Sequence, residues 1–405
     1  MKRILFVDDE QQILDAMKNM LRKRRKEWDM VFVASGAAAL EEMEKSSFDV
    51  IVTDMRMPVM DGAELLEQVC QRFPRTARFV LSGQANSDSI LRVLPFSQQF
   101  LSKPCDPEEL NRVINQTCAL QSNLADDAVR DFVGGVRMLP STVPSMESLK
   151  AAIQEPEVPL TSVTEIIMQD PAATAKILQL VNSAYYGLSR RVPTIQQAVS
   201  LMGTELLQSI CSVRDVFSSF ETRPELQGMT NLIQQHSLQA ARLAAKFVSN
   251  NDPSFVDRVY TAGLLHDIGA LGLAKMQSER YREIIQLAEL TRKRLIDVET
   301  ELKMVPHSLV GGYLLGVWGL PPEIVDCAMY HHNPSACPSG ETDILWAVHA
   351  ADAIADAGSH PGLELTAFLD LEGLEQAGLS HQIDRWTNIY LQSLDEIKRP
   401  VESNP

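Results

Sequence analysis

The sequence predicts a doubly wound α/β domain with a five-stranded parallel sheet over residues 1–120, followed by an all-α part. Three observations support this division. Five short apolar runs alternate with helical patterns in the first third of the chain. Four of these runs end in polar residues that suit one edge of a parallel sheet. From Val133 onward the strand pattern is lost, and apolar residues recur at helical spacing.

The five expected strands are short and rich in strand-forming residues. Between them, apolar residues recur at helical spacing, for example at Ile13, Leu14, Met17 and Leu21, as in helices that cover a sheet. Strands that alternate with helices imply a parallel sheet with right-handed crossovers. The strands are expected at Ile4–Val7, Met30–Ala34, Val50–Thr53, Phe79–Leu81 and Gln99–Leu101.

Composition indicates a globular protein of the cytoplasm. The 405 residues are 45% hydrophobic and 22% charged, without an apolar run long enough to span a membrane. The apolar run after Lys2 and Arg3 stops at Asp8, so we interpret it as a strand and not as a signal peptide. Six scattered cysteines indicate free thiols in a reducing cytosol. The net charge of -16 disfavours binding to nucleic acid or anionic membranes, because it repels phosphates.

Polar residues of related chemistry follow the expected strands. Asp8 and Asp9 follow the first strand, Asp54 ends the third, Ser82 follows the fourth and Lys103 follows the fifth. Because the carboxyl ends of parallel strands meet at one crevice, we expect these side chains to lie together. Crowded carboxylates require a counter-charge, and hard oxygen ligands suit Mg²⁺. Asp54 is then a candidate nucleophile toward a phosphodonor, with Lys103 and Ser82 placed to stabilise the phosphoryl group.

With these residues, the first 120 residues resemble the receiver domain of bacterial two-component response regulators, which is flavodoxin-like. The resemblance implies that a histidine kinase phosphorylates Asp54 and that a hydroxyl, a lysine and an aromatic residue respond to the added charge. Phe100 is also open to interpretation as a core residue, since it lies in an apolar strand and has no phenol. The matching positions are Asp8, Asp9, Asp54 and the carbonyl of Arg56 for Mg²⁺, and Ser82, Phe100 and Lys103 for the switch.

Helix signals mark the all-α part. Residues 121–132 are expected to be a linker, or a continuation of the helix that closes the first domain. Asp170-Pro171 suits a helix N-terminus, and turn residues at Asn182–Gly187 follow the last apolar residues of that helix. With Leu139-Pro140 before them and a His-Asp pair after them, these elements resemble the HDOD domain, a helical module of bacterial signalling proteins related to HD phosphohydrolases. We expect this domain at 133–352, with an HD-like part at 230–352 and a helical extension at 353–405.

Histidines and carboxylates recur in the second half of the chain, in a pattern that suits one or two metal sites on neighbouring helices. The order resembles that of the HD superfamily, in which a divalent metal supports phosphodiester hydrolysis. The alternative interpretation is a polar core left from an ancestral enzyme. The resemblance implies one metal held by His236, His266, Asp267 and Asp352, and a second held by Asp267, His307 and His331 or His332.

Three departures from the related HD-GYP phosphodiesterases weigh against catalysis. Ala270 stands where those enzymes place a lysine, and Leu232 stands where they supply a glutamate. No Gly-Tyr-Pro loop follows His331-His332. These losses weaken the neutralisation of substrate charge and the retention of metal. The resemblance to HDOD itself implies a regulatory module that is usually not catalytic.

These patterns favour a response regulator in which Mg²⁺-dependent phosphorylation of Asp54 controls a helical output that binds a partner protein or a small ligand. The alternative is a phosphorylation-gated, metal-dependent phosphohydrolase, for example a cyclic-dinucleotide phosphodiesterase. A transcription factor is disfavoured, because no helix-turn-helix with a basic recognition face is found. Amphipathic helices expected at Leu363–Leu379 and Ile383–Ile397 cover the core or contact a partner, including a second copy of the chain.

Overall fold

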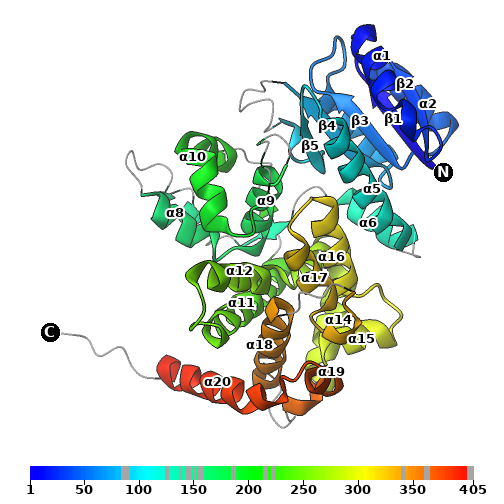
Figure 1. The fold of residues 1–405 in the computed structure, drawn as a ribbon. Coiled ribbons are helices and arrows are strands. Elements are labelled where there is room, and N and C mark those ends of the chain that lie inside the picture. Colours follow the sequence, from blue (N-terminus) through cyan, green and yellow to red (C-terminus); the bar gives the residue numbers. More distant parts are fainter. Residues whose placement is uncertain are drawn as a thin grey trace. The chain divides into compact units, whose positions relative to one another are not determined.

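The structure is a computed structural model that separates the chain into two compact units, shown as a ribbon in Figure 1. The first unit comprises Met1–Ile167, Ala172–Phe220 and Tyr313–Pro321. The second comprises Met168–Pro171, Glu221–Gly312 and Pro322–Pro405. The described residues are 1–83, 92–123, 127–136, 139–142, 147–149, 151–152, 159–183, 186, 188, 190–212, 218–219, 224–338, 343–359 and 365–398.

A five-stranded parallel sheet forms the N-terminal part of the first unit, which confirms the predicted fold. The strand order is β2-β1-β3-β4-β5. β2 therefore lies on one side of β1, and β3, β4 and β5 follow on the other side, as in a doubly wound sheet. β3 and β4 are buried at every position, in keeping with the apolar runs Val50–Val52 and Phe79–Leu81 that they contain. The strands are β1 (Lys2–Val7), β2 (Trp28–Val33), β3 (Val50–Asp54), β4 (Ala77–Ser82) and β5 (Gln99–Ser102).

Helices cover this sheet, and alternate strand residues point to its opposite faces. On one face, Ile4, Phe6 and Phe79 of the sheet pack in one core with Met17 of α1 and Leu110 of α5. α2 and α3 contact β1, β2 and β4. The helices are α1 (Gln11–Met20), α2 (Gly36–Lys45), α3 (Gly62–Arg72) and α5 (Pro107–Asn123), with a 3-10 turn η1 (Arg22–Arg24) after α1.

Among the described residues, the remainder of the first unit consists of helices and a short strand pair, with the turns that connect them. α10 is kinked at Gly203, whose φ of 74° lies in the left-handed region that favours glycine. β6 and β7 pair in parallel over two residues each, which departs from the purely helical expectation because strands this short leave no pattern in the sequence. The elements are α6 (Asp127–Gly135), β6 (Pro140–Ser141), α8 (Leu160–Ile167), α9 (Pro171–Val181), α10 (Ile195–Ser212) and β7 (Ser218–Ser219).

Two predicted segments fall partly outside the described residues. Within 121–132, the structure describes helix up to Asn123 and again from Asp127, while 124–126 lie outside the described residues. α9 begins at Pro171, as the Asp-Pro pair predicted. Of the turn predicted at Asn182–Gly187, positions 184, 185 and 187 lie outside the described residues.

A group of packed helices forms the second unit. α11 contacts α12, α13 and α18, and α20 lies against α11 and α18. Trp386 of α20 contacts Phe247 of α11 at a ring-centre distance of 5.7 Å, so the amphipathic segment at Ile383–Ile397 does cover the core. The elements are α11 (Pro224–Phe247), α12 (Pro253–Leu265), α13 (Ile268–Met276), α14 (Ser278–Thr291), α15 (Leu295–Glu301), α16 (His307–Val317), α17 (Pro322–Tyr330), η3 (Pro334–Ala336), α18 (Asp343–Ser359), η4 (Leu365–Ala367), α19 (Leu371–Gln376), η5 (Ser380–Gln382) and α20 (Ile383–Lys398). The last residues of α16 belong to the first unit.

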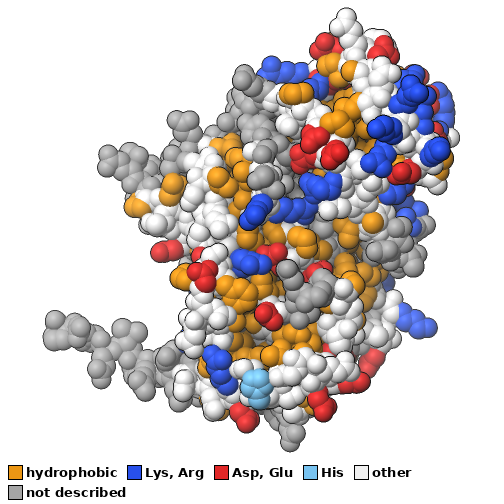
Figure 2. Space-filling model, viewed as in Figure 1, with side chains coloured by type: hydrophobic (Ala, Val, Ile, Leu, Met, Phe, Trp, Pro, Cys, Tyr) orange, Lys and Arg blue, Asp and Glu red, His pale blue; other side chains and the backbone are white. Residues whose placement is uncertain are grey.

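The surface carries charges of both signs. On the face shown in Figure 2, Lys and Arg side chains lie among Asp and Glu side chains, with hydrophobic side chains between them. The acidic excess of the sequence is therefore not gathered into one patch on this face. Among the described residues, we find no helix that is both long and apolar enough to cross a membrane.

α13 and α16 approach each other closely at Gly269. A Cβ atom added to Gly269 would overlap the carbonyl oxygen of His307 and the backbone nitrogen of Gly311. Because both neighbours are backbone atoms, they cannot move aside as a flexible side chain would, and glycine is required here. The contact brings the start of α16 next to the break between α12 and α13.

Replacing Gly269 by alanine is expected to destabilise the protein by about 1–3 kcal/mol, because the added methyl group forces α13 and α16 apart. Thermal unfolding followed by circular dichroism measures this effect as a lower Tm. Gly228→Ala in α11 is the matched control, since a Cβ atom there meets nothing within 4 Å and alanine favours a helix. An unchanged Tm for Gly269→Ala would contradict the close approach of the two helices.

Candidate functional site

The carboxyl edge of the five-stranded sheet brings together three charged residues that the sequence predicted. Asp8 follows β1, Asp54 ends β3 and Lys103 follows β5. The Nζ atom of Lys103 lies 2.7 Å from Oδ2 of Asp8 and 2.6 Å from Oδ1 of Asp54. Asp8 is 1% exposed and Asp54 is 9% exposed. One ammonium group thus holds two nearly buried carboxylates that would otherwise repel each other.

A glycine and a helix cap fix the loop beside Asp54. A Cβ atom on Gly62 would overlap the carbonyl oxygen of Asp54, so the loop passes this close to β3 only with glycine at this position. Asp61 begins α3 with a capping box, in which its side chain and that of Glu64 each accept the other's backbone N–H. The backbone N–H of Arg56 donates to Oδ2 of Asp54 over 3.2 Å. The loop after β3 is thereby held against the Asp54 carboxylate.

Burial and charge act in opposite directions on this group. Burial raises the pKa of Asp54, Lys103 lowers it and the charge of Asp8 raises it, so that the pKa ends above its ordinary value. Burial lowers the pKa of Lys103, but hydrogen bonds to Asp54 and Asp8 outweigh burial and raise it. Lys103 therefore stays charged at neutral pH. The hard carboxylate oxygens at this partly buried edge are a donor set that fits Mg²⁺.

Asp9, also predicted as a Mg²⁺ ligand, does not join this buried group. It is exposed, whereas Asp8 is buried. Within the described residues, Asp8, Asp9 and Asp54 do not form a set of three donors that all lie within 4.8 Å of one another. In this structure the ammonium group of Lys103 joins Asp8 to Asp54 instead.

The two other predicted switch residues are nearly buried. Ser82 ends β4 and is 5% exposed, one residue after Leu81, which pairs with Asp54 across the sheet. Phe100 pairs with Val80 and is 1% exposed, so its ring is part of the core in this structure. Ser82 therefore lies on the strand next to the one that carries Asp54, and Phe100 lies one strand farther away.

A second set of potential ligands lies where several helices of the second unit meet. His236 comes from α11, His307 begins α16 and Asp352 comes from α18. His266-Asp267 occupies the break between α12 and α13, and His331-His332 directly follows α17. All seven predicted residues belong to groups whose donor atoms lie within 4.8 Å of one another. We refer to these seven residues as the His/Asp cluster.

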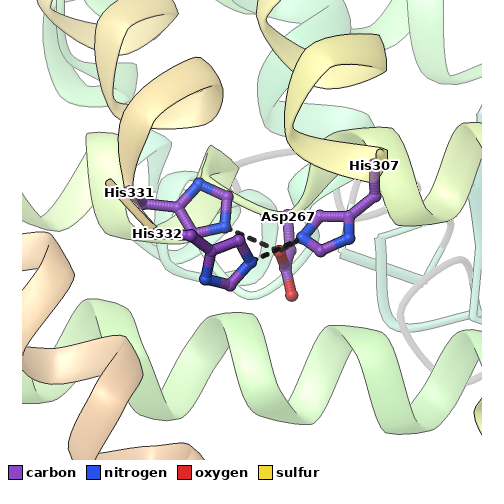
Figure 3. A group of neighbouring side chains, drawn as sticks. All are labelled: Asp267, His307, His331 and His332. Atoms are coloured by element: carbon purple, nitrogen blue, oxygen red, sulfur yellow. Dashed lines mark hydrogen bonds and ion pairs between the residues drawn. The ribbon is translucent and has the colours of Figure 1, made fainter. Parts of the chain in front are cut away.

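Part of the cluster surrounds one carboxylate oxygen. Figure 3 shows the rings of His307, His331 and His332 converging on Asp267. The Nε2 atom of His307 lies 3.2 Å from Oδ1 of Asp267 and 3.0 Å from Nε2 of His332, and Nε2 of His331 lies 3.4 Å from the same Oδ1. Bonds of about 2.1 Å to one metal ion place neighbouring ligand atoms roughly 2.9–3.5 Å apart. The four side chains are thus spaced as donors to one ion would be.

The other residues form an adjoining group around Asp352. The Nε2 atom of His236 lies 2.9 Å from Oδ1 of Asp352 and 3.7 Å from Oδ2 of Asp267. The Nε2 atom of His266 lies 3.4 Å from the same Asp352 oxygen. Asp356, one turn after Asp352 on α18, lies 3.8 Å from Nδ1 of His236. Asp267 also forms a set of three donors with His236 and His266, as a bridging carboxylate would.

Hydrogen bonds determine which nitrogen of the buried histidines faces the cluster. The Nδ1 atom of His266 bonds the carbonyl of Gly263 over 2.6 Å, and that of His331 bonds the carbonyl of Cys327 over 3.0 Å. A carbonyl only accepts, so Nδ1 carries a proton and Nε2 is the ring nitrogen that faces the cluster. These two Nε2 atoms and Oδ1 of Asp267 are buried without a hydrogen-bond partner. Such orphaned acceptors, mostly imidazole nitrogens, fit a divalent transition metal.

Carboxylates and imidazoles of the cluster shift each other's pKa values in opposite directions. Burial raises the pKa of Asp267, but the charges and hydrogen bonds of the surrounding histidines hold it well below its ordinary range. Burial lowers the pKa of His236, but a hydrogen bond to Asp352 and the neighbouring carboxylate charges raise it to about 10. Each buried carboxylate thus requires positive charge, which a protonated imidazole or a metal ion supplies.

Two acidic residues of this region were missed by the sequence analysis. Asp356 lies four residues after Asp352, and this helical spacing could have indicated it. Glu299 is fully buried and accepts a hydrogen bond from Nδ1 of His307 over 2.9 Å. Its sequence neighbours on α15 include exposed acidic residues, so nothing in the sequence distinguished it from a surface glutamate.

Two protein families match successive parts of the chain. The response regulator receiver domain matches residues 4–115. The HDOD domain matches residues 139–334. The first match covers the five-stranded sheet and its helices, and the second covers most of the His/Asp cluster.

Curated relatives share parts of the chain. An uncharacterized protein of Treponema pallidum is 26% identical over 258 residues, which are 62% of this chain and 47% of that protein. The alkaline phosphatase synthesis transcriptional regulatory protein PhoP of Bacillus subtilis is 26% identical over 34% of this chain and 61% of its own. The hydrogenase transcriptional regulatory protein HoxA of Cupriavidus necator is 30% identical over 30% of this chain and 25% of its own. The chain therefore spans less than two thirds of each of these relatives.

Solved structures also resemble the chain. A virulence factor from Campylobacter jejuni aligns over 64% of this chain and 95% of its own, with 22% identity and a TM-score of 0.50, which shows a shared fold. The MmoQ response regulator from Methylococcus capsulatus aligns over 57% of this chain and 91% of its own, with 24% identity and a TM-score of 0.46.

Proposed function

We propose that the chain, which matches the response regulator receiver domain at 4–115 and the HDOD domain at 139–334, is a two-component response regulator in which phosphorylation of Asp54 by a histidine kinase controls what the HDOD domain binds. The bound species is a partner protein or a small ligand. The observation that carries this proposal is the position of Lys103 between Asp8 and Asp54. An ammonium group there pairs with the acceptor carboxylate before the reaction and with the phosphoryl group after it.

Phosphorylation forms a bond between phosphorus and a carboxylate oxygen of Asp54, while the bond between phosphorus and the donor histidine nitrogen breaks. The phosphoryl group brings nearly two negative charges and three acceptor oxygens. We expect Lys103 to pair with this charge and the hydroxyl of Ser82 to donate a hydrogen bond to the phosphoryl group. Bound Mg²⁺, held by Asp8, Asp9, Asp54 and the carbonyl of Arg56, would offset the charge of the carboxylates and the phosphoryl group.

Contacts within the first unit support a connection from the receiver domain to the helices that match HDOD. Gln179 of α9 donates to the carbonyl of Ser97 over 3.1 Å. Lys176 of α9 donates to the carbonyl of Leu94 over 3.0 Å. Both carbonyls belong to the segment that leads into β5, and the strand ends just before Lys103. A rearrangement around Lys103 therefore has a short path to α9.

The buried ammonium of Lys176 makes this connection sensitive to rearrangement. Lys176 is 4% exposed, and its Nζ lies 5.1 Å from the ring centre of Trp318. Burial and the charge of Arg78 lower its pKa to about 7. Losing the carbonyl of Leu94 would leave a buried donor without its acceptor, which is costly. Movement of the segment before β5 is therefore expected to move α9 with it.

Incubation with acetyl phosphate and Mg²⁺ is expected to add one phosphoryl group to the wild-type chain and none to Asp54→Ala, because the acceptor carboxylate is gone. Mass spectrometry of the intact protein measures the added group. Asp15→Ala removes an exposed carboxylate from α1 and is the matched control, which should be labelled like the wild type. Labelling of Asp54→Ala to the wild-type extent would refute the assignment of Asp54.

A metal-dependent phosphohydrolase is the second candidate function, favoured by the orphaned donors of His266, His331 and Asp267. Divalent ions in the His/Asp cluster would supply Lewis-acid chemistry for the hydrolysis of a phosphate ester. The side chains of His236 and His332 are 21% and 15% exposed, so this edge of the cluster contacts solvent. Ala270 and Leu232 still stand where the related phosphodiesterases have a lysine and a glutamate.

Protein dialysed against Mn²⁺ is expected to retain about two ions per chain in the His/Asp cluster, and Asp267→Ala to lose them, because Asp267 belongs both to the set with His307, His331 and His332 and to the set with His236 and His266. Elemental analysis measures the metal, and turnover is measured as phosphate released from nucleotides, nitrophenol released from nitrophenyl phosphates and linear dinucleotide formed from cyclic dinucleotides. Asp384→Ala, which removes an exposed carboxylate from α20, is the control. Retained metal with turnover that Asp267→Ala abolishes supports the hydrolase, whereas wild-type protein without metal rules it out.

A further inference from the structure

Glu299 is a buried carboxylate that the proposed phosphohydrolase does not use as a ligand. It lies on α15 and is 0% exposed. Its Oε2 atom accepts two hydrogen bonds from the same residue, the backbone N–H of His307 over 3.0 Å and the ring Nδ1 of His307 over 2.9 Å. A carboxylate without solvent contact persists only when such bonds compensate for its lost hydration.

Tyr281 of α14 occupies the other oxygen of Glu299. Its hydroxyl donates to Oε1 over 2.9 Å, and the residue is itself 0% exposed. Burial, together with the charges of Glu299 and Asp267, holds the pKa of Tyr281 well above its ordinary value. The phenol therefore keeps its proton and remains a donor. Both oxygens of Glu299 are thus engaged, and the carboxylate is fixed in place beside His307.

The bond to Glu299 determines which ring nitrogen of His307 faces the cluster. Nδ1 of His307 donates its hydrogen bond to Glu299, so Nε2 is the nitrogen that faces Oδ1 of Asp267, 3.2 Å away. His266 and His331 bond neutral backbone carbonyls through Nδ1, whereas His307 bonds an anionic carboxylate. A carboxylate partner raises the basicity of an imidazole and its strength as a metal ligand more than a carbonyl does.

We propose that Glu299 is a positioning residue that orients His307 and strengthens it as a ligand, so that the donor group of Asp267, His307, His331 and His332 holds its divalent transition metal more tightly than the group around Asp352. The inference rests on the metal site of the second candidate function. It divides the His/Asp cluster into two unequal subsites, of which only one depends on Glu299. Tyr281 holds Glu299 in place by a hydrogen bond but does not change the negative charge of the carboxylate that bonds His307.

Glu299→Gln tests the charge directly, because the amide keeps a hydrogen-bond acceptor of the same shape. Isothermal titration of the metal-free, full-length protein with Mn²⁺, in excess Mg²⁺ to occupy the receiver edge, is expected to show two classes of site in the wild type. In Glu299→Gln, the tighter class weakens about 10–100-fold and the other is unchanged. Titration with Co²⁺, followed by visible absorption, should show altered bands for the same class only. Glu299→Asp, which withdraws the carboxylate by one methylene group, gives a second variant with the same expected direction.

Two controls separate positioning from structural damage. Tyr281→Phe removes a buried hydrogen bond from the same carboxylate but keeps its charge and both bonds to His307, so both metal classes should stay close to wild type. Glu301→Gln removes an exposed carboxylate of the same helix and should change neither class. The circular dichroism of each metal-free variant establishes that it is folded before titration.

The outcomes distinguish the inference from the function on which it rests. Selective loss of the tighter class in Glu299→Gln or Glu299→Asp supports the role of Glu299. Wild-type affinity for both classes in the folded variants overturns it and leaves the metal site intact. Absence of metal binding by the wild type overturns the metal site, and the role of Glu299 with it.

Discussion

Both functional regions depend on one constraint: buried carboxylates must be balanced by positive charge. Cationic or imidazole side chains from distant parts of the chain supply this charge in each region. Asp8 and Asp54 share the ammonium group of Lys103. Asp267 and Asp352 are surrounded by the imidazoles of the His/Asp cluster. Removing one partner from a buried ionic set leaves an unpaired charge, which typically costs about 3–5 kcal/mol. The same balance makes each set responsive, because a phosphoryl group or a metal ion changes the charge that the neighbours must match.

The fold assembles the two sets in different ways. In the receiver domain, parallel strands deliver Asp8, Asp54 and Lys103 to one edge of a sheet, and Gly62 lets the following loop pass close to β3. In the second unit, ligands come from helix ends and helix breaks, and Gly269 lets the start of α16 approach α13. In both places, backbone atoms come closer than a side chain would allow.

The sequence predicted the receiver edge well because strand ends are visible as apolar runs that stop at Asp or Lys. It predicted the members of the His/Asp cluster from their order, but not that Asp267 would join both donor groups, since that depends on how helices pack. Glu299 could not be predicted, because its burial follows from the packing of α15 against α14 and α16. The pairing of β6 with β7 leaves no periodicity to detect.

The central claim is that charge added at Asp54 reaches the helices of the HDOD domain. Hydrogen–deuterium exchange of the full-length protein, with and without acetyl phosphate and Mg²⁺, tests it most directly when read at 92–99 and at α9. The account predicts faster amide exchange in both segments after phosphorylation, as the contacts of Lys176 and Gln179 rearrange, and no change in Asp54→Ala. Identical exchange at α9 in phosphorylated and unmodified wild-type protein would contradict it.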